Sequence, residues 1–298
     1  MVYDAIIIGL GASGVSASIY AKRSGLNIAV INLGIPGGII GESSVVENYP
    51  GFISISGMDL AIKYFEHFNS LNVPLFNEEV IDIKLENDIK CVYTKNNKYL
   101  AKNVIICSGR KPKKLGIHNE DKYFGNGISY CVTCDGNLYK NKVVCVVGGG
   151  NSALESVIYL SNICKKVYLL VRKDRVIGDN SLLLDINNLN NVEIKYNTQI
   201  TEIIEDNNKI SGVNTNNGIL NLDGIFVNIG YEPSNGILKS LDIELDKNYI
   251  VVDKNMQTNI NGIYACGDII KKDLYQLVTA VNDGAIAANH IYRNKKTK

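Results

Sequence analysis

The sequence predicts an α/β fold of two Rossmann-like dinucleotide-binding domains with three-layer ββα architecture, the second inserted into the first. Two observations predict this fold: a β-branched segment runs into a glycine-rich turn at Gly9, and the same arrangement recurs at Gly148. A helix pattern and another apolar strand follow each turn, which gives the β-α-β unit that holds a dinucleotide. A third observation, the pair Cys131 and Cys134 just before the second turn, adds a redox element.

The first unit reads as a strand over residues 3–8, a helix over 13–24 and a strand over 28–31. Its turn contains the pattern Gly-x-Gly-x-x-Gly, formed by Gly9, Gly11 and Gly14. The first glycine permits a tight turn, the second lets backbone approach a pyrophosphate, and the third lets the helix pack on the strand. The residue expected to hold the ribose hydroxyls is Asn32, which can hydrogen-bond but carries no charge.

The second unit reads as a strand over residues 143–147, a helix over 152–161 and a strand over 167–171. Its turn contains Gly148, Gly150 and Ala153. No acidic residue follows the last strand, and the cations Arg172, Lys173 and Arg175 cluster there instead. Such a cluster suits a 2′-phosphate and favours NADPH over NADH. The alternative is an ordinary solvated basic loop.

The segments between and after these units set the domain boundaries. Residues 79–106 alternate strand-like runs with turn residues, which predicts a β-meander, and residues 194–227 form its counterpart after the second unit. Pro112 and Pro233 follow the two points where the chain crosses between domains. We therefore expect one domain over 1–111 and 234–298, and a second domain that carries the cysteine pair over 112–233.

Cys131 and Cys134 have the spacing of a redox dithiol at a helix start, where backbone N–H groups favour the thiolate. Asp135 follows directly and can pass a proton to a leaving thiolate. Zinc would require two further ligands, and the three histidines are isolated. We therefore expect no metal site, and we expect the other five cysteines to be inert small hydrophobic residues.

Composition excludes several classes of partner. The chain has 298 residues, 46% of them hydrophobic, and a net charge of +1, so it can bury a core and offers no reason to bind nucleic acid. No apolar run approaches the roughly 18 residues that span a bilayer. A strand pattern begins at residue 3, leaving no room for a signal peptide, so we expect a cytoplasmic protein.

Taken together, several motifs in order resemble the low-molecular-weight thioredoxin reductases over essentially the whole chain. Besides the two glycine turns they are Pro36-Gly37-Gly38, Glu47-Asn48-Tyr49-Pro50-Gly51, Ser129-Tyr130-Cys131-x-x-Cys134-Asp135-Gly136, Asn151-Ser152-Ala153-x-Glu155, Ala265-Cys266-Gly267-Asp268 and Gln276 onward. The resemblance implies an FAD-binding domain over 1–111 and 234–298 and an NAD(P)H-binding domain over 112–233, with NADPH as the donor. It further implies a homodimer and thioredoxin or a thioredoxin-like protein as partner. It also implies that Cys134 lies nearer the flavin, that Cys131 attacks the partner's disulfide, and that Asp135 acts as acid and base.

The resemblance extends to the residues that would bind cofactors. Asp268 ends an apolar strand, where it could accept a hydrogen bond from a polyol or simply form a turn. The candidate FAD contacts are Gly9, Gly11, Ser13, Gly14, Asn32, Gly37, Gly38, Ile39, Asn48, Val80, Gly109, Asp268, Tyr275, Gln276 and Leu277. The candidate NAD(P)H contacts are Gly148, Gly150, Asn151, Ser152, Ala153, Glu155, Arg172, Lys173 and Arg175.

The sequence departs from the family pattern at three of these sites and at Ile177. Lys173 and Ile177 stand where the family has arginine, and lysine is the weaker partner for a phosphate. Ile39 replaces glutamine and Tyr275 replaces arginine near the expected flavin. NADH or a non-nicotinamide donor therefore stays open beside NADPH. Two other functions also stay open: a dithiol oxidase that uses O₂, and a flavoprotein sensor without turnover.

Overall fold

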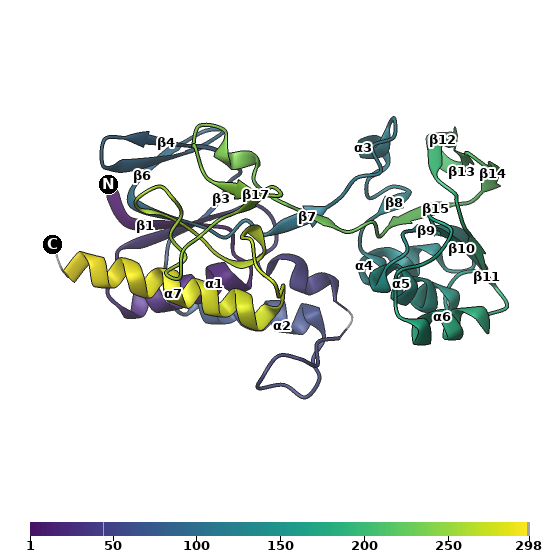
Figure 1. The fold of residues 1–298 in the computed structure, drawn as a ribbon, viewed down its shortest axis with the longest axis horizontal. Coiled ribbons are helices and arrows are strands. Elements are labelled where there is room, and N and C mark those ends of the chain that lie inside the picture. Colours follow the sequence, from purple (N-terminus) through teal and green to yellow (C-terminus); the bar gives the residue numbers. More distant parts are fainter. Residues whose placement is uncertain (44, 297–298) are drawn as a thin grey trace. The chain divides into compact units, whose positions relative to one another are not determined.

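In the computed structural model, which describes residues 1–43 and 45–296, the chain divides into two compact units. One comprises Met1–Lys111 and Glu232–Lys298, and the other comprises Pro112–Tyr231 (Figure 1). The chain therefore leaves the first unit once and returns to it once. No helix among the described residues is long and apolar enough to cross a membrane.

The first unit is built on a seven-stranded sheet in the order β3-β2-β1-β6-β5-β4, with β19 also paired to β6. β1, β2, β3, β6 and β19 run parallel, while β4 and β5 form the predicted antiparallel meander with β6. The strands are β1 (Val2–Ile8), β2 (Ile28–Asn32), β3 (Leu75–Asn77), β4 (Val80–Glu86), β5 (Ile89–Thr94), β6 (Lys98–Ile106) and β19 (Ile263–Ala265). The helices are α1 (Ala12–Arg23), α2 (Gly57–Asn69) and α7 (Leu277–Lys296), and a small sheet pairs β17 (Leu245–Asp246) with β18 (Tyr249–Ile250).

Alternation along β1 produces three layers in this unit. Side chains of successive strand residues point to opposite faces. Ala5 and Ile7 pack in one buried cluster with Ala17 of α1 and Ala287 of α7. Ile6 and Ile8 pack in another with residues of β4 and β5. Because both faces are covered, the strand reads as a continuous apolar run.

Helices α1 and α7 lie side by side against the sheet (Figure 1). Small residues make this close approach possible: a Cβ built on Gly284 of α7 would lie 2.2 Å from the Ser13 carbonyl oxygen of α1. The segment after residue 234 thus completes the first unit by covering the helix that follows the first glycine turn.

The second unit has a five-stranded parallel sheet in the order β11-β10-β9-β15-β8 and a three-stranded antiparallel sheet in the order β12-β13-β14. The parallel strands are β8 (Ile128–Ser129), β9 (Val143–Val147), β10 (Lys166–Leu170), β11 (Val192–Lys195) and β15 (Gly224–Val227). The antiparallel strands are β12 (Ile200–Asp206), β13 (Lys209–Thr215) and β14 (Gly218–Asn221). The helices are α3 (Glu120–Tyr123), α4 (Val132–Asp135), α5 (Asn151–Ser161) and α6 (Asn180–Asn187).

The same alternation gives the second unit its layers. Val144 and Val146 of β9 pack in a cluster with Leu154 and Val157 of α5. Cys145 and Val147 face the other way, in a cluster that includes Val213 of β13 and residues flanking β14. Helices α5 and α6 thus lie on one side of the parallel sheet and β12–β14 on the other (Figure 1). Helix–sheet–sheet layering in both units is the predicted ββα architecture.

Two short strands, β7 (Arg110–Pro112) and β16 (Tyr231–Pro233), carry the chain between the units and pair with each other. Hydrogen bonds from Lys113 N to Gly230 O and from Ser234 N to Gly109 O, both 2.9 Å, continue this pairing beyond the strands. The two crossing segments are therefore tied into one ribbon.

Replacing Gly284 with alanine tests the α1–α7 packing. We expect a loss of about 1–3 kcal/mol in unfolding free energy, because the added methyl overlaps the Ser13 carbonyl and forces the helices apart. Urea unfolding measures the loss, and hydrogen exchange should place it in α7. The matched control is Gly236→Ala, where the added Cβ meets no described atom within 4 Å. An equal loss in the control would contradict the assignment.

Candidate functional site

In the first unit, register places three chain segments at one edge of the sheet. Ile8 of β1 and Ala265 of β19 both pair with Ile106 of β6, and all three strands are parallel. Their carboxyl ends therefore coincide, and ligands of open parallel sheets bind at such an edge. The glycine turn, the segment containing Gly109 and the segment containing Asp268 all start here.

The first turn is held by close backbone packing and by the side chain of Asn32. Gly9 has φ +97°, and a Cβ there would lie 2.4 Å from the Cys107 carbonyl oxygen, so only glycine fits. The side-chain oxygen of Asn32 accepts a 2.9 Å hydrogen bond from Leu10 N, and Gly37 N donates to Leu10 O at 2.8 Å. Asn32 thus supports the turn directly, a role that the sequence did not indicate.

This turn fits a dinucleotide pyrophosphate. Helix α1 starts after Gly11, and among the described residues no side chain caps it and no acid lies in its first turn. A Cβ built on Gly11 would have its nearest described neighbour 3.8 Å away, so the backbone is open to a close ligand. The N–H groups of the first turn, which no described side chain caps, and the positive helix end both favour an anion here.

Asp268 is already paired with a cation from β7, the outgoing crossing segment (the linker). Arg110 donates from Nε (3.1 Å) and Nη2 (2.7 Å) to the same Asp268 oxygen, and its guanidinium lies 4.5 Å from the centre of the Tyr275 ring. The other Asp268 oxygen is 4.0 Å from Lys272 Nζ. Arg110 was not among the predicted site residues, although its position directly after Gly109 could have indicated it.

Other predicted FAD contacts are distributed around this edge. Asn48 donates a 3.0 Å hydrogen bond to Gln276, which joins segments 228 residues apart. Gly38 and Ile39 lie in a short 3₁₀ helix (Gly38–Glu42), and Gly11 forms a β-bridge with Gly37. The Val80 side chain is buried in the core cluster, so only its backbone is available. Ser13 and Gly14 lie in α1, and Leu277 begins α7.

In the second unit, register again collects the predicted residues at one sheet edge. Val147 of β9 pairs with Leu170 of β10 and with Val227 of β15, and Phe226 of β15 pairs with Ser129 of β8. The second glycine turn, the basic loop and the cysteine pair all follow directly after these strand ends. Only β15 separates the strand before the turn from the strand before the cysteines, a span of roughly 10 Å.

The second turn also fits a dinucleotide. Gly148 has φ +154°, and a Cβ there would lie 2.3 Å from the Asn228 carbonyl oxygen. A Cβ on Gly150 would meet no described atom within 4 Å, and no described side chain caps α5. The Asn228 side-chain oxygen is buried without a hydrogen-bond partner in the described structure, which leaves an acceptor beside the turn.

The other candidate nucleotide contacts form two groups, one on α5 and one in the basic loop after β10. Asn151 accepts from Asp179 N and donates to the Asp179 carboxylate, both at 2.8 Å, which fixes the start of α5. Ser152 and Glu155 lie exposed on the same helix, and Ala153 is buried. The cations Arg172, Lys173 and Arg175 are exposed, and none forms an ion pair with a described residue. Ile177 beside them is 73% exposed.

Cys131 and Cys134 form a disulfide with their Cα atoms 5.3 Å apart. Cys131 caps the short helix α4, and its sulfur accepts a 3.2 Å hydrogen bond from Cys134 N. The loop is held further by Ser129, whose hydroxyl accepts from Cys131 N at 3.0 Å. Asp135 is half-buried at the end of α4. This is a reducible disulfide on the surface of its unit.

The other five cysteines are free and buried. Burial raises the pKa of Cys164 to about 11 and raises the pKa of Cys145 further. Burial, and then contact with Cys107, raises the pKa of Cys266 well above its ordinary value. A protonated buried thiol is a poor nucleophile, so the redox chemistry is confined to the disulfide.

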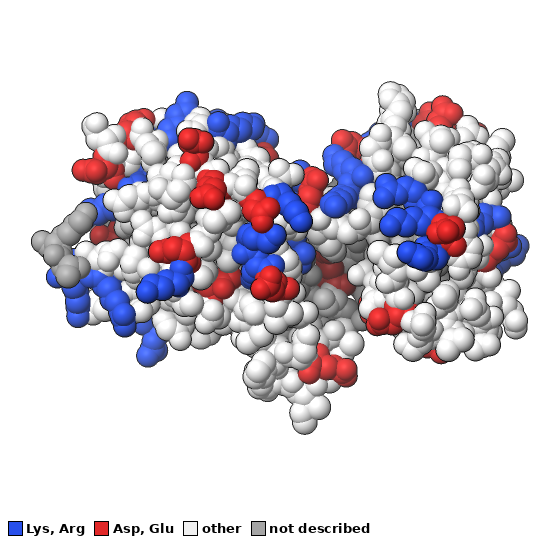
Figure 2. Space-filling model, viewed as in Figure 1, with Lys and Arg blue, Asp and Glu red and all other residues white. Residues whose placement is uncertain are grey.

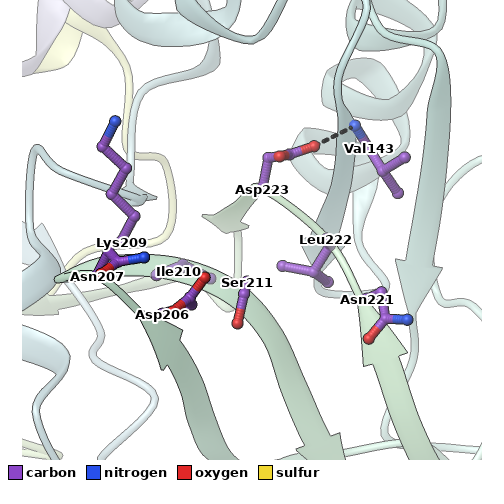
Figure 3. Close-up of a pocket in the computed structure, with 9 residues that line it drawn as sticks. All are labelled: Val143, Asp206, Asn207, Lys209, Ile210, Ser211, Asn221, Leu222 and Asp223. Carbon is purple, nitrogen blue, oxygen red and sulfur yellow. Dashed lines mark hydrogen bonds between the residues drawn. The ribbon is translucent and has the colours of Figure 1, made fainter.

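The remaining surface shows no comparable arrangement among the described residues. Lys and Arg as well as Asp and Glu occur on the visible face of each unit (Figure 2). An open pocket of the second unit, about 640 Å³, lies between the end of the β12–β13 hairpin and the segment from Asn221 to Asp223 (Figure 3). None of the predicted site residues lines it. No group of three potential metal ligands occurs in the described chain.

Comparison with known proteins supports these observations. A family model described as pyridine nucleotide-disulphide oxidoreductase matches residues 3–284. The chain belongs to this family. A relative from Ureaplasma parvum, named thioredoxin reductase, is 42% identical over 96% of this chain and 95% of its own length.

Solved structures give the same result. The thioredoxin reductase of Lactococcus lactis superposes with a TM-score of 0.89 at 32% identity, covering 99% of this chain and 100% of that one. The thioredoxin reductase of T. acidophilum gives 0.86 at 36% identity, covering 99% of both chains. Family membership implies FAD and a pyridine nucleotide, which agrees with the two turns described above.

Proposed function

We propose that this chain is a thioredoxin reductase that passes two electrons from NADPH through FAD to the Cys131–Cys134 disulfide, and then to a thioredoxin-like protein. The observation that carries the proposal is the common sheet edge that places a reducible disulfide and a nucleotide-type glycine turn in one unit. Bound FAD would supply the exchange between a two-electron hydride donor and a disulfide.

The first unit would hold FAD at the edge formed by β1, β6 and β19. The N-terminus of α1 would bind the pyrophosphate, and the free side of the Asp268 carboxylate would accept a ribityl hydroxyl. Asn48 and Gln276, joined by their hydrogen bond, would orient each other toward the ring. In the second unit the N-terminus of α5 would bind the nicotinamide nucleotide.

The geometry of the cysteine loop supports different roles for the two sulfurs. Once the disulfide opens, the Cys131 sulfur is the one that accepts the N–H of Cys134, which stabilises a thiolate. Cys131 would attack the partner's disulfide and form a mixed disulfide, and Cys134 would displace the reduced partner. Asp135, next to Cys134, would hold and return the proton.

Reduction of a thioredoxin-like protein tests the proposal. The FAD-loaded protein should oxidise NADPH only when an oxidised thioredoxin is present, and Cys131→Ser and Cys134→Ser should each lower turnover by at least about a hundredfold. Cys164→Ser is the control, because that thiol is buried and protonated. Thiol-dependent peroxide formation without thioredoxin turnover would instead indicate a dithiol oxidase.

The basic loop supports NADPH over NADH. Exposed cations without described ion-pair partners are available to a 2′-phosphate, and arginine binds phosphate through two parallel hydrogen bonds. Ile177 removes one such contact from the family pattern, so the preference should be modest.

Arg172→Ala should lower kcat/KM for NADPH by about tenfold, since it removes one charge-assisted hydrogen bond, and should change kcat/KM for NADH by less than about twofold. Stopped-flow reduction of the bound flavin by each nucleotide measures both values. Lys195→Ala, which alters a cation paired with Glu193, is the control. Equal losses with both nucleotides would remove the phosphate assignment.

We also propose that the protein is a homodimer, as the family resemblance implies, and that it is cytoplasmic. Large apolar side chains are exposed in one stretch of the first unit, including Ile35 (83%) and Ile53 (97%). Burial of such side chains against a second copy would remove them from water. Sedimentation should give the mass of a dimer, and Ile53→Lys should weaken it. A monomer at micromolar concentration would contradict this proposal.

A further inference from the structure

The second unit contains a buried carboxylate for which the proposed reaction has no use. Glu120, the first residue of α3, is 4% exposed. Its two oxygens accept hydrogen bonds from Leu115 N and Gly116 N, both at 2.8 Å. A buried carboxylate is costly unless its oxygens are paired, and these two amides come from the segment that enters the unit from the linker.

The same carboxylate reaches the redox loop. The Tyr130 hydroxyl donates to Glu120 at 2.5 Å, and Tyr130 directly precedes Cys131. Burial, and then this hydrogen bond, raise the pKa of Tyr130, so the phenol stays protonated and acts as donor. The Tyr130 ring also lies 5.7 Å from that of Phe124. Glu120 thus joins the linker end to the residue before the disulfide.

The loop needs such an anchor because its strand is short. β8 contains only Ile128 and Ser129 and lies at the edge of the parallel sheet. The ladder therefore stops one residue before Tyr130. Beyond it, the Ser129 hydroxyl bonds the backbone of Cys131, but Ser129 itself depends on the same short strand.

We propose that Glu120 and Tyr130 are positioning residues that hold the Cys131–Cys134 loop in the geometry in which the two sulfurs meet. The inference rests on the proposed function for its biological meaning, but not for its measurement. A loop held in this geometry keeps the two thiols close after reduction, which favours closure of the disulfide. Releasing the loop lowers their effective concentration and favours the dithiol.

Equilibration of the FAD-loaded protein with reduced and oxidised dithiothreitol tests the proposal. The reagent gives two electrons and two protons to the Cys131–Cys134 bond and closes its own disulfide, so the equilibrium is a balanced exchange. Alkylation followed by mass spectrometry counts the opened pair. Neither a nicotinamide nor thioredoxin is present, so the result is independent of whether the chain reduces thioredoxin.

Tyr130→Phe removes only the hydroxyl, and Glu120→Gln replaces an oxygen acceptor with an amide donor. We expect each to shift the equilibrium at least threefold toward the dithiol; a tenfold shift corresponds to about 30 mV. In a Glu120→Ala background the Tyr130→Phe effect should disappear, because the acceptor of the Tyr130 hydroxyl is then absent. With thioredoxin as substrate, kcat should fall while KM changes little.

The matched control is Asp4→Asn. Asp4 is also a buried carboxylate, 8% exposed, and it accepts from Asn27 N (2.9 Å) and Lys295 Nζ (2.7 Å) in the other unit. It should lower Tm and leave the dithiol equilibrium within twofold. If Tyr130→Phe also stays within twofold, the proposal is wrong. If Glu120→Gln fails to fold, Tyr130→Phe alone decides, since it retains the ring and its packing.

Discussion

The alignment of parallel strand ends is the constraint on which both sites depend. In the first unit Ile8, Ile106 and Ala265 are neighbours across three strands, and in the second Val147 lies between Leu170 and Val227. A shift of one residue would turn every side chain of a strand to the opposite face. Because each of these strands buries both faces, packing in the core fixes the register. The segments that follow the strands therefore start at one edge of the sheet.

This dependence explains why so much of the fold could be predicted from the sequence. The glycine turns, the apolar runs before them and the meander between residues 79 and 106 are local patterns with direct structural causes. The structure confirms the α/β class and the layering, because β1 and β9 alternate between a helical face and an antiparallel face. The cysteine spacing likewise indicated a redox pair, and the pair is joined.

The side-chain contacts around the two sites could not be predicted from local patterns in the same way. Arg110 meets Asp268 across 158 residues, and Glu120 meets Tyr130 through side chains that no motif relates. Asn32 was expected at the ribose, and its oxygen also accepts a hydrogen bond from the Leu10 amide, which no motif indicated. Such pairings depend on how side chains converge after the chain has folded, and a single sequence has no periodicity or spacing that encodes them.

The two unpredicted charged residues, Arg110 and Glu120, hold the two ends of the segment that leaves the first unit. Arg110 binds Asp268 within the first unit, and Glu120 binds the backbone of Leu115 and Gly116 within the second. Each therefore ties one end of the outgoing segment to the site of its own unit. Between these ties the outgoing segment pairs with the returning segment, through a 2.9 Å hydrogen bond from Lys113 N to Gly230 O. Each site is therefore held by contacts inside its own unit.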